Sequence, residues 1–425
     1  MSDQEKTTET STAPSNQQNT SHSKLHPTIL KLGFVSFFAD ISSEMLYPIT
    51  PIFLTTVLGA SMTSLGVIEG CAEAVASLLK TYSGVWSDKI SKRKPFIFFG
   101  YLLAALAKPL VGFSQTWLHV LFARSLDRLG KGIRSAPRDA LIADSVSSEK
   151  RGAAFGWHRG MDTLGAALGP LMALYFLTLH PQDLRSIYKW ALIPGLVAVL
   201  LVLSVSEKSS AIKNKTSNNN LISPKKNWFE HWHSLDLNLK KFFAAWGVFS
   251  LTNSSDVFLL LKAKSTGASI QTIILLYCAY NLIYALSSPY LGKLSDRWPR
   301  KKILMLGLLT FALVYLGFGL ASDIWQYALL FLLYGLYMGA TDGISKAFTL
   351  DLTNKDLKAT SLGVLGTITG LSTLFASTCA GYIWDHGGAF WTFAFGASGA
   401  LLALVLLSQI KLSPNGQLVS NTIEH

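Results

Sequence analysis

Cysteine and charged residues are both scarce in this sequence. Its only three cysteines, Cys71, Cys278 and Cys379, have neither metal-ligand spacing nor the pattern of a disulfide framework. Charged residues make up 15% of the chain, whereas a soluble protein normally carries about 25%. A large apolar core and a membrane protein both fit this composition, so the distribution of the apolar residues has to decide between them.

Signatures of pumps and enzymes are also missing. Gly292-Lys293 lacks the upstream glycine and the following Ser or Thr of a phosphate-binding loop, and no nucleotide-binding domain is evident. The sequence has no HExxH motif, no metal-spaced set of His and Asp, and no nucleophile elbow. We therefore expect no enzymatic activity, no metal and no cofactor.

Apolar residues come in blocks of about 20, the length of helix that crosses about 30 Å of hydrocarbon. The pattern predicts an all-α membrane protein with twelve transmembrane helices. The predicted helices span 29–57, 62–87, 94–113, 116–138, 153–178, 187–205, 241–263, 269–292, 302–321, 324–346, 360–384 and 389–410. The first block is too long for a signal peptide, so we expect it to remain as the first helix.

Polar segments divide the chain into two halves. We predict a disordered cytoplasmic tail over 1–28, where Ser, Thr, Gln and Asn dominate. Residues 206–238 form a polar linker, which we expect in the cytoplasm between a bundle of six helices over 29–205 and a second over 239–410. Residues 411–425 would form a second cytoplasmic tail.

The net charge of +12 is concentrated on one side of the predicted membrane. Connectors on the side of the N-terminus hold Lys89, Lys92, Arg93, Lys94, Arg138, Lys150, Arg151, the lysines from Lys208 to Lys241, Lys293 through Lys302, Lys346, Lys355 and Lys358. The opposite side has only Arg185, Lys189, Lys262 and Lys264. Because cytoplasmic loops are enriched in Lys and Arg, we predict cytoplasmic termini and an inner (plasma) membrane location. The basic excess then signals topology, and we expect no nucleic-acid partner.

The polar residues of the two halves repeat each other. Gly84-Val-Trp-Ser-Asp88-Lys89 with the cluster Lys92-Arg93-Lys94 recurs as Gly292-Lys-Leu-Ser-Asp296-Arg297 with Arg300-Lys301-Lys302. Asp144, Glu149, Arg151 and Gly156 are spaced like Asp351, Asp356, Lys358 and Gly363, and Ser42-Ser43-Glu44 matches Ser254-Ser255-Asp256. All the matches keep one order, at offsets of 207–212 residues. The architecture we expect is two parallel six-helix bundles related by a pseudo-twofold axis.

The repeated loop resembles the signature between helices 2 and 3 of the major facilitator superfamily, although Ser91 and Pro299 stand where the family usually has Gly. The run Gly156-x8-Gly165-x3-Gly169-Pro170 resembles the helix 5 motif of the superfamily's antiporters. The stretch from Arg128 to Ala136 has the spacing of their helix 4 motif, with Lys131 and Arg134 in place of Gln and Gly. The resemblance implies a transporter fold in which helices 1, 4, 7 and 10 line a central cavity.

The resemblance also implies a gate at the repeated loop, with topology anchoring as the alternative. The gate residues it suggests are Gly84, Asp88, Lys89, Arg93, Gly292, Asp296 and Arg297. Gly84 and Gly292 would let a neighbouring helix approach closely, as small residues do in membranes. For the helix 5 residues Gly165, Gly169 and Pro170, an export function and ordinary tight packing both stay open.

Charged residues inside the predicted helices are the main anomaly of the first half. They are Asp40, Glu44, Glu69, Glu73, Asp127 and Asp162 against Lys80, Lys108, Arg124, Arg128, Lys131, Arg134 and Arg159. Each would cost about 2.5–3.5 kcal/mol when facing lipid at the membrane centre, so they must face an interior or a wet cavity. Asp40 and Glu44, like Glu69 and Glu73, are four residues apart and share a helix face. The basic residues from Arg124 to Arg138 form a stripe on one side of their helix.

We expect a substrate and proton pathway among these residues and their counterparts in the second half. Its members are Asp40, Glu44, Glu69, Glu73, Arg124, Arg128, Lys131, Asn253, Asp256 and Asn281. Buried carboxylates hold protons more readily than exposed ones and could couple transport to protons. The alternative is a static network of salt bridges. For Arg128 the alternatives are a contact with an anionic substrate and an ion pair with Asp40 or Glu44. His158 is expected to be structural.

The function that fits is secondary active transport by alternating access. We expect proton coupling, a small polar or anionic organic solute, and export slightly favoured over import. The alternatives are a proton-driven exporter of drugs or cations, and a transporter-like sensor without flux. The expected partners are the lipid bilayer, the solute and protons, and we expect a functional monomer.

Overall fold

The computed structural model describes residues 26–90, 92–146, 151–181, 183–207, 235–353 and 358–410. The helices of the first half are α1 (Pro27–Glu44), α2 (Thr50–Ile52), a π-helix (Phe53–Val57), α3 (Met62–Ile90), α4 (Lys94–Gly112), α5 (Trp117–Asp144), α6 (Arg151–Leu179), α7 (Leu184–Trp190) and α8 (Leu192–Leu203). Those of the second half are α10 (Leu237–Ser250), α11 (Val257–Ser265), α12 (Ile270–Arg297), α13 (Arg300–Leu320), α14 (Ile324–Asp351), α15 (Lys358–Gly387) and α16 (Ala389–Ser408). Most of the predicted tails and linker, at 1–25, 208–234 and 411–425, lies outside the described residues.

Each of the twelve predicted ranges is occupied by helix. Nine helical stretches in the described part of the chain are long and apolar enough to cross a membrane by length and composition. The other three predicted crossings are α1 with α2 and the π-helix, the charge-bearing α5, and α10 with α11, which are pieces of 14 and 9 residues. Large apolar side chains face outward, such as Phe122, Leu200 and Leu313, each 60% exposed or more. Such an apolar surface is rare on soluble monomers and suits contact with lipid.

Local sequence signals explain several helix starts. The side chain of Asp236 accepts a hydrogen bond from Asn238 N at the start of α10, and Ser269 caps α12 through Thr272 N. Asp323 and Gln326 form a reciprocal capping box at the start of α14. These short polar side chains satisfy N–H groups that the first turn of a helix leaves without partners.

The first helix of each half is interrupted at a position that the repeat relates. In the first half α1 ends at Glu44 and turns occupy 45–49, while in the second half α10 ends at Ser250 and helix resumes at Val257. The exposed backbone groups find partners, as where Ser255 N donates to Ser377 Oγ of α15. Irregular backbone at membrane depth needs such internal partners. The two breaks place Glu44 and Asp256 at equivalent points.

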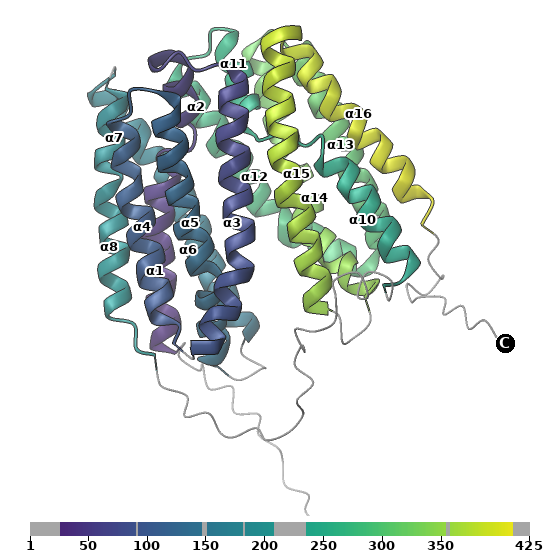
Figure 1. Ribbon diagram of the computed structural model, residues 1–425. Helices are drawn as coiled ribbons and strands as arrows, with labels where there is room; N and C mark the ends of the chain where they lie inside the picture. The colour runs from purple at the N-terminus through teal and green to yellow at the C-terminus, as the bar shows by residue number, and fades with distance from the viewer. Residues whose placement is uncertain are drawn as a thin grey trace, which may run out of the picture.

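The helices form two bundles that lie side by side (Figure 1). In the first bundle α1 packs on α6 and α8, and α5 packs on α3 and α4; in the second, α12 packs on α14, and α13 on α14 and α16. The main contact between the bundles runs between α3 and α15, which stand next to each other in Figure 1. A smaller contact joins α6 to α12.

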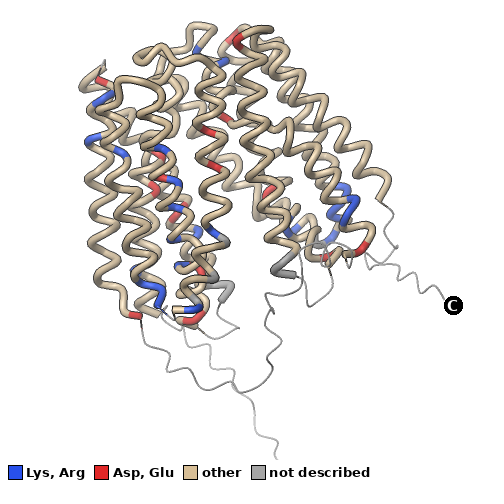
Figure 2. Tube along the Cα trace, in the orientation of Figure 1, with Lys and Arg blue, Asp and Glu red and all other residues tan. Residues whose placement is uncertain are grey.

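The molecule has two ends that differ in charge. We call the end that holds the connectors 92–93, 145–146, 206–207 and 298–299 the basic end, and the end that holds 58–61 and 266–269 the far end. Lys89, Lys94 and Arg300 lie at the basic end, as predicted from the loop charges. Figure 2 shows charged residues along much of the first bundle, whereas the second bundle has few away from its ends.

Candidate functional site

Two glycines of α6 let α1 approach closely. A Cβ atom on Gly165 would collide with the carbonyl oxygen of Phe37 and lie 3.1 Å from the Cβ of Asp40. On Gly169 it would lie 2.8 Å from the carbonyl oxygen of Ile41 and 3.0 Å from the Cβ of Glu44. The next residue, Pro170, is buried. The helix 5 motif therefore packs tightly and fixes the position of both α1 carboxylates, while its link to export stays a prediction.

Asp40 and Glu44 lie one turn apart on α1 in contrasting surroundings. The hydroxyl of Tyr277, on α12 of the second bundle, donates a hydrogen bond to Glu44 Oε2. Among the described residues Asp40 has no direct hydrogen-bond or ion-pair partner for its carboxylate. Its charged neighbours include Asp162 and Lys131. Glu44 thus links the two bundles, whereas the carboxylate of Asp40 is left without a fixed partner.

The two carboxylates of α3 also differ. Glu69 is 8% exposed, and its Oε1 accepts a hydrogen bond of 2.7 Å from Arg124 Nη2 of α5. Glu73, one turn further on, is exposed and has no direct partner in the described part of the chain. The sequence predicted that the two carboxylates share one face of α3. In the structure Glu69 forms a buried ion pair, whereas Glu73 does not.

The basic stripe of α5 is partly neutralised inside the first bundle. Asp127 lies 3.7 Å from Lys108 Nζ of α4 and 3.8 Å from Arg128 Nε. An ion pair with Asp40 or Glu44, one of the two alternatives for Arg128, is not found among the described residues, where Arg128 pairs with the adjacent Asp127. Lys131 is exposed and has no direct side-chain partner among the described residues.

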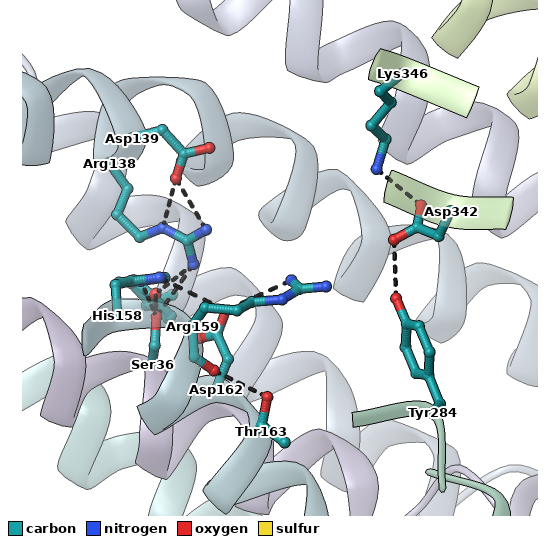
Figure 3. A network of polar contacts seen from close by, with 11 residues as sticks. Ser36, Arg138, Asp139, His158, Arg159, Asp162, Thr163, Tyr284, Asp342 and Lys346 are labelled. Atoms are coloured by element: carbon teal, nitrogen blue, oxygen red, sulfur yellow. Dashed lines mark hydrogen bonds and ion pairs between the residues drawn. The ribbon is translucent and has the colours of Figure 1, made fainter. Parts of the chain in front are cut away.

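His158, in the half of α6 that lies nearer the basic end, belongs to a polar network (Figure 3). Its Nε2 lies 2.7 Å from Ser36 Oγ, and its Nδ1 lies 3.6 Å from Asp162. Arg138 Nη1 donates to the same Ser36 hydroxyl at 3.1 Å. These contacts tie α1, α5 and α6 together, which agrees with the structural role expected for His158. Figure 3 also shows Arg159 reaching from α6 into the space before Tyr284 and Asp342.

Around Asp256 the second bundle presents tyrosine hydroxyls instead of basic partners. Asp256 accepts hydrogen bonds from Tyr280 at 2.9 Å and from Tyr334 at 3.2 Å. Asn253 Nδ2 donates to the Tyr337 hydroxyl at 3.4 Å. The side chain of Asn281 turns back to the carbonyl oxygen of Tyr277 on its own helix. Two tyrosine hydroxyls therefore bind the carboxylate of Asp256, and the side-chain amide of Asn281 bonds to the backbone of its own helix.

Sequence reasoning missed Tyr47 as part of this site. Its ring lies 5.2 Å from that of Tyr277, beside the contact between Glu44 and Tyr277. The spacing could have indicated it, since Tyr47 follows Glu44 by three residues and would share its face on a continuous helix. The helix ends between the two residues, however, so helical periodicity does not relate them. Tyr47 and Glu44 of the first bundle thus both contact Tyr277 of the second.

The repeated loop forms the same ion pair in both halves. Arg93 Nη1 lies 2.6 Å from Asp144 Oδ2, and Arg300 Nη1 lies 2.5 Å from Asp351 Oδ1. Each pair ties the start of one helix to the end of the helix after it, α4 to α5 and α13 to α14. This matching geometry is direct structural support for the repeat.

The glycines and acids of the loop differ between the halves. A Cβ on Gly84 would lie 3.2 Å from the Cβ of Ala136, so α3 does approach α5 there, but the space around Gly292 is open. The close contact expected at Gly292 is therefore wrong for this structure. Lys89 and Arg297 are exposed. The side chains of Asp88 and Asp296 lie outside the described residues, so their gate role stays a prediction.

Within the described residues, no group of three or more His, Cys, Asp or Glu side chains could hold a metal ion. The three cysteines, which are all described, are free thiols. The site consists of charged side chains on α1, α3 and α5 and of tyrosines on α12 and α14, joined by the contact between Glu44 and Tyr277.

Two packed helical bundles with polar residues at the breaks of their first helices define a multi-pass membrane protein of the transporter type. The profile of the Major Facilitator Superfamily matches residues 32–262 and 242–418. An uncharacterised MFS-type transporter of Methanocaldococcus jannaschii is 36% identical over 397 residues, which cover 92% of this chain and 96% of the relative. The chain belongs to the Major Facilitator Superfamily.

Other similar proteins are more distant. The multidrug resistance protein MdtG of Proteus mirabilis is 25% identical over 71% of this chain and 75% of its own length. The crystal structure of the nucleoside transporter NupG has a TM-score of 0.73 at 13% identity, covering 90% of this chain and 99% of that one. The human organic anion transporter MFSD10 has a TM-score of 0.62 at 16% identity, covering 91% and 100%. These structures support the fold alone.

Proposed function

We propose that this protein is a proton-coupled secondary transporter that moves a small polar or anionic organic solute by alternating access. Export is the favoured direction, on the resemblance of the helix 5 motif. The basic end faces the cytoplasm, because its connectors carry the excess of Lys and Arg, and the membrane is the inner (plasma) membrane. We propose that the monomer is the functional unit.

The observation that carries this proposal is the contrast between paired and unpaired charges in the first bundle. Glu69 and Asp127 are held by basic partners, whereas Asp40, Glu73 and Lys131 have no direct partner among the described residues. Asp40 sits on the α1 segment that Gly165 packs against. A carboxylate without a fixed partner can exchange its proton without breaking an ion pair, which is what coupling requires.

Arg128 is the proposed contact for the anionic group of the solute. Its only described ion-pair partner is the adjacent Asp127, at 3.8 Å, which Lys108 shares. The guanidinium therefore keeps donors for a carboxylate or phosphate, which its fork geometry suits. The repeated loop with Asp88 and Asp296 would stabilise one closed state at the basic end.

A cation or drug exporter is the second candidate function. One observation favours it: Asp256 lies among Tyr280, Tyr334 and Tyr337, and aromatic rings with a carboxylate suit organic cations. MdtG is also named for multidrug resistance. Inhibition by anionic solutes and by lipophilic cations would separate the two candidates.

The experiment begins with an unbiased comparison of metabolites in cells with and without the protein. The solutes that differ are then tested in proteoliposomes under an imposed pH gradient. We expect accumulation of a polar or anionic solute that stops when the gradient is collapsed. Arg128→Lys should raise the half-saturating concentration about tenfold, because it keeps charge but loses the fork.

The same assay can contradict the proposal. Accumulation that ignores the pH gradient would remove proton coupling, and an unchanged affinity in Arg128→Lys would remove the proposed anion contact. Absence of flux for every solute that differs would favour a sensor.

A further inference from the structure

A carboxylate of the second bundle caps a helix of the first bundle at the far end. Asp385, near the end of α15, accepts hydrogen bonds from the backbone of α3 through both of its oxygens. Met62 N lies 3.0 Å from Oδ1, and Thr63 N lies 2.8 Å from Oδ2. The hydroxyl of Thr63 adds a third bond to Oδ2, at 2.6 Å. These three bonds join residues more than 320 positions apart in the chain.

The start of α3 needs this carboxylate, because its own cap is incomplete. The hydroxyl of Ser61 accepts from Ser64 N at 3.1 Å. That leaves the N–H groups of Met62 and Thr63, which no residue of the helix itself can satisfy. A carboxylate at the first turn accepts charge-assisted bonds and interacts favourably with the helix dipole. Asp385 therefore completes in trans the cap that Ser61 begins in cis.

Close packing below the cap places Asp385 over the first turn of α3. A Cβ on Gly381 would collide with the carbonyl oxygen of Met62, and one on Gly66 would collide with that of Ser377. On Gly70 it would lie 2.6 Å from the Cα of Leu374. Helices with such small residues approach to backbone contact. The cap thus forms only when α3 and α15 are in full contact at the far end.

The repeat supplies a second helix pair for comparison. Its equivalents of α3 and α15 are α12 and α6, which share a smaller contact. Ser269 corresponds to Ser61 and caps α12 in the same way, accepting from Thr272 N at 3.1 Å. At the offset of 207 that relates Asp144 to Asp351, Asp385 corresponds to Thr178, whose hydroxyl bonds to Tyr175 of its own helix. Within the described residues, the cap across the bundles therefore exists in one of the two helix pairs.

We propose that Asp385 and Thr63 form a latch that stabilises the state in which the far end is closed. The latch rests on the alternating access of the proposed function but not on the solute or on protons. When the bundles separate at the far end, all three bonds break. The N–H groups of Met62 and Thr63 then form hydrogen bonds with water instead. Asp385 is then a positioning residue that sets the balance between the two states.

The test is a distance measurement between spin labels at His180→Cys and Ser322→Cys. These exposed positions lie at the far end, one in each bundle. The background is the full chain with Cys71, Cys278 and Cys379 changed to Ala. No solute and no gradient are added, so a failed latch leaves the proposed proton coupling untouched, and the reverse also holds.

We expect Asp385→Ala to raise the ratio of long to short distances about tenfold, from the loss of charge-assisted capping bonds. Thr63→Val removes only the hydroxyl and should raise the ratio about threefold. Ser269→Ala is the matched control, since it removes a cap within one helix and should leave the ratio unchanged.

A ratio in Asp385→Ala equal to that of the unsubstituted protein would overturn the proposal, as would an equal shift in Ser269→Ala. Should Asp385→Ala fail to reach the membrane, Thr63→Val and Asp385→Asn decide the question. Both must raise the ratio, and an unchanged ratio in either contradicts the latch.

Discussion

The two bundles come from one repeated plan but fill their interiors with different chemistry. Glu69 and Glu73 of α3 correspond to Tyr277 and Asn281 of α12, 208 residues further on. Glu69 pairs with Arg124, whereas Tyr277 donates a hydrogen bond to Glu44 and Asn281 bonds to its own helix. At these equivalent positions the first bundle uses a buried ion pair, whereas the second uses a tyrosine hydroxyl and an amide.

This difference shows that the helix arrangement does not depend on which polar groups fill it. What the membrane requires is that each buried polar group has a partner. An ion pair and a tyrosine hydroxyl both meet that requirement, but the loss of one partner has a different consequence in each case. Loss of one ion-pair partner leaves a buried charge, whereas loss of one hydroxyl among several leaves a carboxylate that is still partnered.

The largest expected effect follows from the buried pair of Glu69 and Arg124. Glu69→Ala leaves the guanidinium of Arg124 buried without its counter-charge and should destabilise the protein by about 3–5 kcal/mol. Tyr280→Phe in the second bundle leaves Asp256 with the hydroxyl of Tyr334, so it should cost only about 1 kcal/mol. Thermal unfolding in detergent measures both variants.

A rescue variant sharpens this contrast. Replacing both partners with apolar residues, as in Glu69→Leu with Arg124→Met, should recover most of the lost stability. Equal losses in Glu69→Ala and Tyr280→Phe would mean that the two interiors do not differ in the way proposed.

A smaller effect is expected where α1 packs on α6. Gly165→Ala places a Cβ against the carbonyl oxygen of Phe37 and should cost about 1–3 kcal/mol, displacing Asp40 as α1 moves away. The equivalent position in the second bundle, 207 residues on, is the buried Ser372, which already carries a Cβ. Ser372→Gly should cost about 0.5 kcal/mol, mainly through helix propensity. The unfolding temperatures of both variants are compared with that of the unsubstituted protein. A Gly165→Ala variant as stable as the unsubstituted protein would refute tight packing of α1 on α6.

Much of the fold could be predicted from the sequence, because apolar length, loop charge and repeat are local patterns. The ranges of all twelve predicted helices and the gathering of basic residues such as Arg93 at one end follow from such patterns. Partner choice in the interior could not be predicted. Arg124 finds Glu69 across 55 residues, and Arg128 finds its neighbour Asp127 instead of Asp40 or Glu44. Several basic residues on one face compete for several acids, and only the packed helices decide between them.

The open space at Gly292 and the cap by Asp385 were out of reach for another reason. The first depends on how helices pack within a bundle and the second on how the two bundles meet, and a pattern within one helix encodes neither. The same motif therefore gives a close contact at Gly84 and none at Gly292. Asp385 carries no signal in the sequence beyond being an acid near the end of a helix.

The central claim is that carboxylates of the first bundle couple transport to protons. Its most direct test compares accumulation driven by a pH gradient with solute exchange in proteoliposomes, for Asp40→Asn, Glu44→Gln, Glu69→Gln and Glu73→Gln. Asp256→Asn is the matched variant of the second bundle. We predict that Asp40→Asn abolishes accumulation but keeps exchange, and that Asp256→Asn keeps both. Accumulation retained in all four variants of the first bundle, or lost only in Asp256→Asn, would contradict the account.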